Sequence, residues 1–225
     1  MSDFLLIPGA GGTAWYWTRV VDELARRGHR GVAVELPGDD PNEGLLEYAG
    51  RVVLAGSGLS SITLVAQSMG GFTAPLAWPH IDVARVVFVN AMIPLPGERP
   101  GEWWGNVDSA GAMREAAIAH GYSQEFDLDT YFLHDVSPEL AAEGEPYQRN
   151  EDDRAFDDVC SFEWPDVPIH AVAGRDDRFF PVEFQQRLAR ERLNVEAAVL
   201  PGGHLMALSQ PVALTEHLAA LTTED

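Results

Sequence analysis

The stretch Thr63–Phe72 reads TLVAQSMGGF and places Ser68 at the corner between a β-type run and a pair of glycines. The apolar residues before Ser68 predict a buried strand, and the residues after it predict a helix. Ala66 lies two positions before the serine, and Gly70 lies two positions after it. Small residues at this spacing are typical of a nucleophile elbow, a turn so sharp that strand and helix nearly touch. The stretch therefore predicts a reactive serine on an α/β fold.

Six short and almost continuously apolar runs indicate strands that are buried on both faces of a parallel sheet. They are residues 4–7, 31–36, 61–67, 85–91, 168–174 and 195–200. Helical patterns alternate with these runs. Trp17 and Leu24 fall on the apolar face of a helix after the first run, and Pro181 is suited to the first turn of another. Pro211 marks either the start of a closing helix or a kink in it. The alternation predicts a mostly parallel, doubly wound sheet of about six strands.

The region 93–165 departs from the alternation of strands and helices, because it contains helical fragments, prolines and acidic runs but no buried-strand pattern. A structureless loop of that length is improbable inside a compact domain. We therefore expect an inserted helical lid at 93–165, with residues 1–92 and 166–225 forming the core. Most aromatic side chains of the lid are expected to anchor it, and one or two are expected to face a substrate.

Composition limits the class of protein. The 225 residues suffice for one domain with a full core, and hydrophobic residues make up 46% of them. A formal net charge of −20 disfavours nucleic acid and membranes as partners, and a solvated acidic surface accounts for it. The single cysteine, Cys160, excludes an internal disulfide and a cysteine-built metal site. No secretion leader and no apolar run near the ~20 residues that cross a bilayer are present, so we expect a cytoplasmic protein.

A reactive serine needs a base that takes its proton and a carboxylate that orients the base. In chain order, the candidates after Ser68 are Asp176 or Asp177, just past the fifth predicted strand, and His204, just past the sixth. All of these positions fall at the carboxyl edge of the predicted sheet, where open α/β sheets place their sites. The order serine, acid, histidine is the one expected for this kind of fold.

The negative charge that develops on an attacked carbonyl needs N–H donors beside the serine. The glycine-rich turn at residues 8–12 follows the first strand, and we expect the backbone N–H of Ala10 to be one donor. The N–H of Met69, at the start of the helix after Ser68, is the other expected donor. The sequence contains no metal-binding, phosphate-loop or dinucleotide motif, so neither a metal ion nor a cofactor is predicted.

The sequence resembles the serine hydrolases of the α/β-hydrolase fold, and among them the small methylesterase and hydroxynitrile lyase group. The resemblance covers essentially the whole chain, through PGAGGTAWYW (8–17), AQSMGG (66–71), GRDDRFFP (174–181) and GGHLMALSQP (202–211). In that family the acid stands three residues after a glycine and four before a proline. Gly174 and Pro181 occupy those places here, so the resemblance implies Asp177 as the acid, with Asp176 in reserve.

Three departures from the family pattern bear on function. Ala66 stands where the elbow usually has glycine, and a methyl group is tolerable at that contact. Pro8 stands where the opening often has histidine, which alters the support of the oxyanion loop but leaves the expected oxyanion donors, the N–H groups of Ala10 and Met69, in place. Lyases of the group carry a lysine directly after the catalytic histidine, whereas Leu205 follows His204 here. Because no cation is present there to hold a cyanide-like leaving group, the resemblance implies esterase-like hydrolysis rather than lyase activity.

We therefore expect a cofactor-independent serine esterase that cleaves a small, largely apolar ester, with Ser68, Asp177 and His204 as its catalytic residues. The expected substrate contacts are Trp15, Trp103, Trp104 and Leu205. Two alternatives stay open. The first is that the chain uses the same three residues as a thioesterase, a lactonase or a C–C bond hydrolase. The second is that the chain is a ligand-binding protein of this fold that retains the three residues but has negligible turnover.

Overall fold

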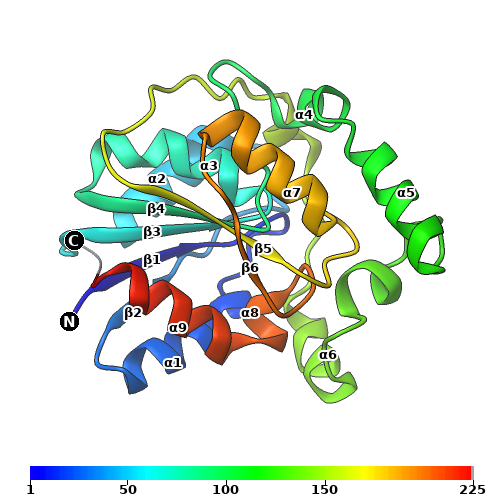
Figure 1. Ribbon diagram of the computed structural model, residues 1–225. Helices are drawn as coiled ribbons and strands as arrows, with labels where there is room; N and C mark the ends of the chain where they lie inside the picture. The colour runs from blue at the N-terminus through cyan, green and yellow to red at the C-terminus, as the bar shows by residue number, and fades with distance from the viewer. Residues whose placement is uncertain (224–225) are drawn as a thin grey trace.

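The computed structural model describes residues 1–223, and in them six parallel strands form one sheet in the order β2-β1-β3-β4-β5-β6 (Figure 1). The strands are β1 (Asp3–Ile7), β2 (Arg30–Ala33), β3 (Ile62–Gln67), β4 (Val83–Val89), β5 (Ile169–Gly174) and β6 (Ala198–Leu200). Every neighbouring pair of strands is parallel. The predicted doubly wound α/β architecture is confirmed.

The two outermost strands are shorter than the apolar runs that predicted them. Residues 31–36 and 195–200 were expected to be strands, but β2 ends at Ala33 and β6 begins at Ala198. Each of these strands has a neighbour on one side only, so the ladder ends where the chain turns away from that neighbour. At β2 one further bond continues the ladder, from the Val34 N–H to the Leu6 oxygen at 2.9 Å.

Helices cover both faces of the sheet (Figure 1). One face carries α2 (Leu45–Ala55), α3 (Gly70–Ala77) and α7 (Val182–Leu188), and the other carries α1 (Thr18–Arg26), α8 (Met206–Ser209) and α9 (Pro211–Leu221). Successive residues of a strand point to opposite faces. Leu5 and Ile7 accordingly pack in the first core, and Phe4 and Leu6 in the second, all of them fully buried. Burial on both faces explains why the strands are continuously apolar.

The helices follow the predicted pattern with one omission. Pro211 is the first residue of α9 rather than a kink within it, and α7 begins directly after Pro181. Helix α2 was not predicted, although Leu45, Tyr48 and Val52 follow its 3.6-residue period and are all buried. The signal for this helix was therefore present in the sequence.

Between β4 and β5 the chain forms helices. They are α4 (Pro100–Asn106), α5 (Ser109–His120), the π-helix η3 (Asp129–Leu133), α6 (Pro138–Gly144) and the 3-10 turns η4 (Glu145–Tyr147) and η5 (Asp153–Asp157). In Figure 1 the helices α4, α5 and α6 lie beyond the end of the sheet to which the strands run. We call residues 93–165 the inserted segment; its role as a lid stays a prediction.

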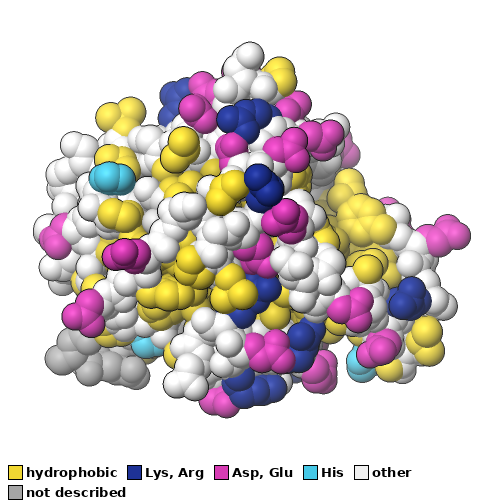
Figure 2. Space-filling view, turned by 90° about the horizontal axis from the view of Figure 1, so that it is seen from above, with side chains coloured by type: hydrophobic (Ala, Val, Ile, Leu, Met, Phe, Trp, Pro, Cys, Tyr) yellow, Lys and Arg dark blue, Asp and Glu magenta, His cyan; other side chains and the backbone are white. Residues whose placement is uncertain are grey.

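Acidic and basic side chains are interspersed on one face of the molecule (Figure 2). On the face drawn in Figure 2, arginine side chains lie between the acidic ones, so the acidic side chains do not gather in a single field there. Within residues 1–223, none of the helices has the length and apolar character that crossing a lipid bilayer requires.

Candidate active site

Ser68 occupies the turn between β3 and α3 with a backbone φ of 49°, in the left-handed region that side-chain-bearing residues seldom adopt. Its carbonyl oxygen accepts the N–H groups of Gly71 at 3.0 Å and Met92 at 2.9 Å. A Cβ atom on Gly70 would lie 2.5 Å from the Pro8 oxygen, and one on Gly71 would overlap the Met92 oxygen. The first turn of α3 therefore lies so close to the loops after β1 and β4 that only glycine fits at these two positions.

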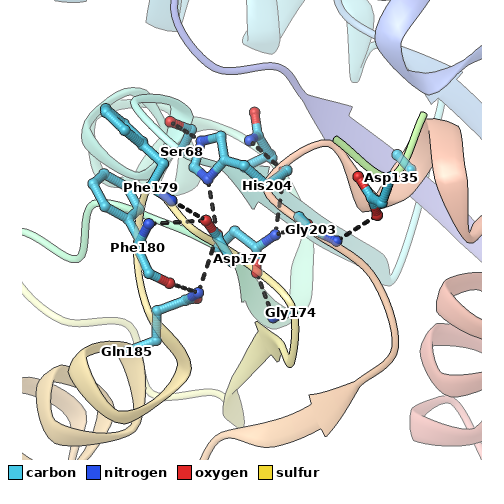
Figure 3. Close-up of polar contacts among 12 residues, drawn as sticks. Ser68, Asp135, Gly174, Asp177, Phe179, Phe180, Gln185, Gly203 and His204 are labelled. Carbon is cyan, nitrogen blue, oxygen red and sulfur yellow. Dashed lines mark hydrogen bonds and ion pairs between the residues drawn. The ribbon is translucent and has the colours of Figure 1, made fainter. Parts of the chain in front are cut away.

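Three side chains from the loops after β3, β5 and β6 form one continuous line of hydrogen bonds (Figure 3). The Nε2 atom of His204 lies 3.1 Å from Oγ of Ser68, and its Nδ1 atom lies 2.9 Å from Oδ2 of Asp177. The exposed fractions of Ser68, Asp177 and His204 are 8%, 4% and 0%. A carboxylate bound to Nδ1 fixes the tautomer in which Nε2 accepts the proton of the serine hydroxyl.

The carboxylate of Asp177 is held in place by its own loop. Its Oδ1 atom accepts the backbone N–H groups of Phe179 at 2.9 Å and Phe180 at 2.8 Å. Its Oδ2 atom also accepts the side-chain amide of Gln185 at 3.2 Å. The tight turn after Gly174 therefore orients the carboxylate toward the histidine before any substrate arrives.

Asp176, the reserve candidate for the acid, has other partners. It pairs with Arg175 at 3.2 Å and accepts the Gly202 N–H at 3.1 Å. Burial alone raises the pKa of Asp176, but the Arg175 guanidinium and the Gly202 N–H hold that pKa below its ordinary value. Of the two candidate carboxylates, the structure brings only Asp177 to His204.

Asn90 was not among the predicted site residues, yet it joins the loops of the acid and the base. Its Oδ1 atom accepts the Gly174 N–H at 2.7 Å, while Nδ2 donates to the Gly203 oxygen at 2.9 Å and the His204 oxygen at 3.2 Å. Asn90 is fully buried and has a φ of 45°. A polar amide directly after an apolar strand, at the carboxyl edge of the sheet, was the sequence signal for this residue.

Aromatic side chains enclose the imidazole. The rings of Phe132, Phe179 and Phe180 have their centroids 4.8, 5.1 and 5.1 Å from that of His204. Phe132 comes from η3 in the inserted segment, so this segment contributes directly to the surroundings of the histidine. Such an apolar enclosure keeps water away and strengthens the hydrogen bonds inside it.

The glycine-rich loop at residues 8–12 passes directly beside the nucleophile candidate. A Cβ atom on Gly9 would lie 2.7 Å from the Cβ of Ser68, and the Gly12 N–H closes a turn onto the Gly9 oxygen at 3.1 Å. Ala10 lies within this turn, and Met69 is the residue that precedes α3. The roles of these two N–H groups as oxyanion donors remain predictions.

A cavity of about 560 Å³ adjoins this loop and the inserted segment. Its apolar lining includes Trp15, Tyr16, Phe132, Leu133, Val136, Leu140, Tyr147, Leu205 and Leu208. Of the predicted substrate contacts, Trp15 and Leu205 line the cavity, whereas Trp103 and Trp104 lie outside its lining. Trp103 is fully buried in the core, where its indole N–H donates to the Ile93 oxygen at 3.0 Å.

Other reactive groups have ordinary structural roles. Cys160 is fully buried, its Sγ atom lies 3.3 Å from the Phe72 oxygen, and burial raises its pKa to about 12. A thiol with that pKa is not an effective nucleophile near neutral pH. In the part of the chain that the structure describes, no group of three His, Cys, Asp or Glu residues is arranged to hold a metal ion.

Comparison with known sequences matches this chain to a protein family and to a named relative. The sequence profile described as "Alpha/beta hydrolase family" matches residues 4–217. A protein of Oryza sativa subsp. indica named "Probable esterase PIR7A" is 33% identical over 110 residues. That match covers 44% of this chain and 42% of the rice protein, so it spans less than half of the relative's length.

Comparison with solved structures gives the same fold. An extracellular alpha/beta-hydrolase from a Paenibacillus species superimposes with a TM-score of 0.78 and 19% identity, covering 100% of both chains. The crystal structure of polyneuridine aldehyde esterase superimposes with a TM-score of 0.78 and 19% identity, covering 99% of both chains. At this level of identity, the similarity is one of fold.

Proposed function

This chain belongs to the alpha/beta hydrolase family, and from that premise we propose that it is a serine esterase that forms an acyl-enzyme on Ser68. The observation that carries the proposal is the unbroken contact from the Ser68 hydroxyl through His204 to Asp177. Its geometry suits proton transfer, since both distances are ordinary hydrogen-bond distances. The rice relative that is named a probable esterase supports an ester as the bond cleaved.

In the proposed mechanism, Nε2 of His204 takes the proton of Ser68 as its Oγ attacks the ester carbonyl. Asp177 holds Nδ1 and stabilises the imidazolium that forms. The backbone N–H groups of Ala10 and Met69 hold the oxyanion of the tetrahedral intermediate. His204 then protonates the leaving alcohol, and the acyl group stays on Ser68. A water molecule that is deprotonated by His204 attacks this acyl-enzyme. The imidazolium of His204 then returns the proton to Oγ of Ser68 as the acid leaves, which restores the serine.

The cavity supports a small, largely apolar substrate. Its volume of about 560 Å³ lies within the range of small-molecule sites. Trp15 and Leu205 are the predicted substrate contacts that lie in its lining. Leu205 also supplies no charge beside His204, which favours hydrolysis over a lyase reaction that would need a cation there.

We also propose that the protein acts in the cytoplasm on a small-molecule substrate. The Paenibacillus protein of the same fold is extracellular. Because a protein of this fold can be extracellular, the location needs a test of its own. Fractionation of cells that produce the chain at its natural level tests the location separately from the chemistry.

A substrate panel tests the proposed reaction and separates it from the alternatives. We expect the highest kcat/KM on a short, uncharged p-nitrophenyl ester, and lower values on an acyl-thioester, a lactone and a diketone. A highest value on one of the other three substrates would replace the esterase by the corresponding hydrolase. Tight binding of a substrate without turnover would identify a ligand-binding protein.

A further inference from the structure

Asp135 of the inserted segment binds the loop that carries the proposed base (Figure 3). Its Oδ2 atom accepts the backbone N–H of Gly203 at 2.6 Å, and Gly203 directly precedes His204. The same oxygen accepts the hydroxyl of Ser209 at 2.7 Å, at the end of α8. A hydrogen bond to a carboxylate is stronger than one between neutral groups, so this contact fixes the backbone next to the histidine.

Glu151 makes the corresponding contact on the other side of the site. Its Oε2 atom accepts the backbone N–H of Gly11 at 2.7 Å, and Gly11 directly follows Ala10, the proposed oxyanion donor. Its Oε1 atom accepts the hydroxyl of Tyr48 at 2.6 Å. The carboxylate therefore links the glycine-rich loop to α2 and to the inserted segment.

Close packing accompanies both contacts. A Cβ atom on Gly203 would lie 2.8 Å from Oδ1 of Asp135 and 2.8 Å from Nε2 of His134. A Cβ atom on Gly11 would lie 2.5 Å from the Arg149 oxygen. The inserted segment therefore packs directly against the glycine backbone of both loops. Because this packing leaves no gap, a displacement of the segment would displace the loops as well.

The two carboxylates bracket the stretch 136–150, which we call the cavity wall. Val136, Leu140, Ala141, Gly144 and Tyr147 from this stretch line the cavity. Asp135 immediately precedes the wall, and Glu151 immediately follows it. The stretch that lines the cavity is thus tied at one end to the loop of the proposed base and at the other end to the loop of the proposed oxyanion donor.

We propose that Asp135 and Glu151 are positioning residues that couple the cavity wall to the catalytic groups. This inference rests on the proposed esterase mechanism. Asp135 acts through Gly203 on the placement of His204, and Glu151 acts through Gly11 on the placement of the Ala10 N–H. Neither side chain lines the cavity, so their loss lowers kcat more than it raises KM. A displacement of a catalytic group by about 1 Å lowers rates by about 100-fold.

Hydrogen–deuterium exchange, read peptide by peptide, tests the coupling without requiring turnover. We expect Asp135→Ala to raise exchange in peptides covering 201–205 and to leave 8–12 as in the wild type. Glu151→Ala is expected to do the reverse. Glu125→Ala is the matched control, because Glu125 is an exposed carboxylate of the same inserted segment. It is expected to change neither loop.

Steady-state kinetics on p-nitrophenyl acetate supplies the second measurement. Each alanine variant is expected to lower kcat by about 10- to 100-fold and to change KM by less than about threefold. Asp135→Asn and Glu151→Gln are expected to restore most of kcat. In Asp135→Asn the amide oxygen can take the place of Oδ2, which accepts both the Gly203 N–H and the Ser209 hydroxyl. In Glu151→Gln the amide oxygen still accepts the Gly11 N–H, and the Tyr48 hydroxyl can turn to accept a hydrogen bond from the amide.

Three results are distinguishable from the expected one. Local exchange and kcat equal to those of Glu125→Ala, in an active wild type, would overturn the inference and leave the esterase standing. Exchange that rises in all peptides of an alanine variant, or a variant that fails to fold, would also overturn the inference, because the carboxylates would then stabilise the whole fold rather than the two loops. A wild type that cleaves no ester would contradict the proposed function, while the exchange pattern would still decide whether the two carboxylates hold the two loops.

Discussion

The Nδ1 atom of His204 lies 2.9 Å from Oδ2 of Asp177, while the neighbouring Asp176 binds Arg175 and the Gly202 N–H instead. We predict that Asp177→Asn lowers kcat by about 10⁴-fold, because an amide no longer selects the productive tautomer or stabilises the imidazolium. The matched variant Asp176→Asn is expected to stay within about threefold of the wild type. Initial rates on a p-nitrophenyl ester measure both. Equal losses in the two variants would contradict the assignment of the acid.

Asn90 is expected to be needed for both stability and activity. Asn90→Gly keeps the positive φ accessible but removes the hydrogen bonds to Gly174, Gly203 and His204, leaving buried groups unpaired. We predict a loss of about 2–4 kcal/mol in the free energy of unfolding, measured by urea denaturation. Asn90→Ala is expected to lose about 1 kcal/mol more, since it also has a strained backbone. A glycine variant as stable as the wild type would show that the three bonds contribute nothing.

Gly71 and Gly50 form a matched pair of glycine-to-alanine substitutions. A Cβ atom on Gly71 would overlap the Met92 oxygen beside Ser68, whereas one on Gly50, in the exposed part of α2, would meet nothing within 4 Å. We predict that Gly71→Ala lowers the free energy of unfolding by about 1–3 kcal/mol, with a fall in kcat. Gly50→Ala is expected to raise it by about 0.5–1 kcal/mol. Thermal and urea unfolding measure the free energy of unfolding of both variants. A Gly71→Ala variant that is as stable as the wild type would argue against close packing at the elbow.

The buried carboxyl group of Glu151 is expected to make the free energy of unfolding depend on pH. Burial raises the pKa of Glu151 above its ordinary value, although hydrogen bonds from Tyr48 and Gly11 oppose this shift. The folded chain therefore holds this proton up to a higher pH than the unfolded chain does. Stability derived from the group falls as pH rises from the ordinary carboxyl pKa, ~4.3, through the raised one.

The comparison of the wild type with Glu151→Gln isolates this effect, since the other titrating groups are shared. We predict that the wild type loses stability relative to Glu151→Gln as pH rises through that window, and that the difference is constant above it. Urea unfolding at a series of pH values measures the difference. The exposed Glu125→Gln should show no such trend, and a difference that instead grows in favour of the wild type would contradict the raised pKa.

Much of the fold was predictable because it depends on local pattern. The continuous apolar runs identified all six strands, since a strand buried on both faces has no polar side to display. Gly70, Gly71 and Ala66 indicated the elbow because small residues at this spacing are typical of it. In the structure the carbonyl oxygens of Pro8 and Met92 leave no room for a Cβ atom at the two glycines. The choice of Asp177 over Asp176 came from the family resemblance, because adjacent aspartates have the same local sequence signal.

The remaining features depend on contacts between distant segments. Asn90 has its role because the loops of Gly174 and Gly203 converge on it, and no local pattern encodes that meeting. Trp15 lines the cavity and Trp103 is buried in the core, although both are tryptophans near predicted helices. The packing of the inserted segment decides between such roles, and helical periodicity alone does not reveal it.

Labelling with a fluorophosphonate, followed by mass spectrometry of the modified peptide, tests most directly whether Ser68 is a nucleophile activated by His204. We predict one label per chain on the peptide that contains Ser68, none on Ser68→Ala, and labelling at least about 100-fold slower on His204→Ala. Ser68→Ala should also lower kcat by about 10⁴- to 10⁶-fold while the fold is kept. A wild-type chain that hydrolyses esters yet carries no label at Ser68, or that is labelled equally fast without His204, would contradict the account.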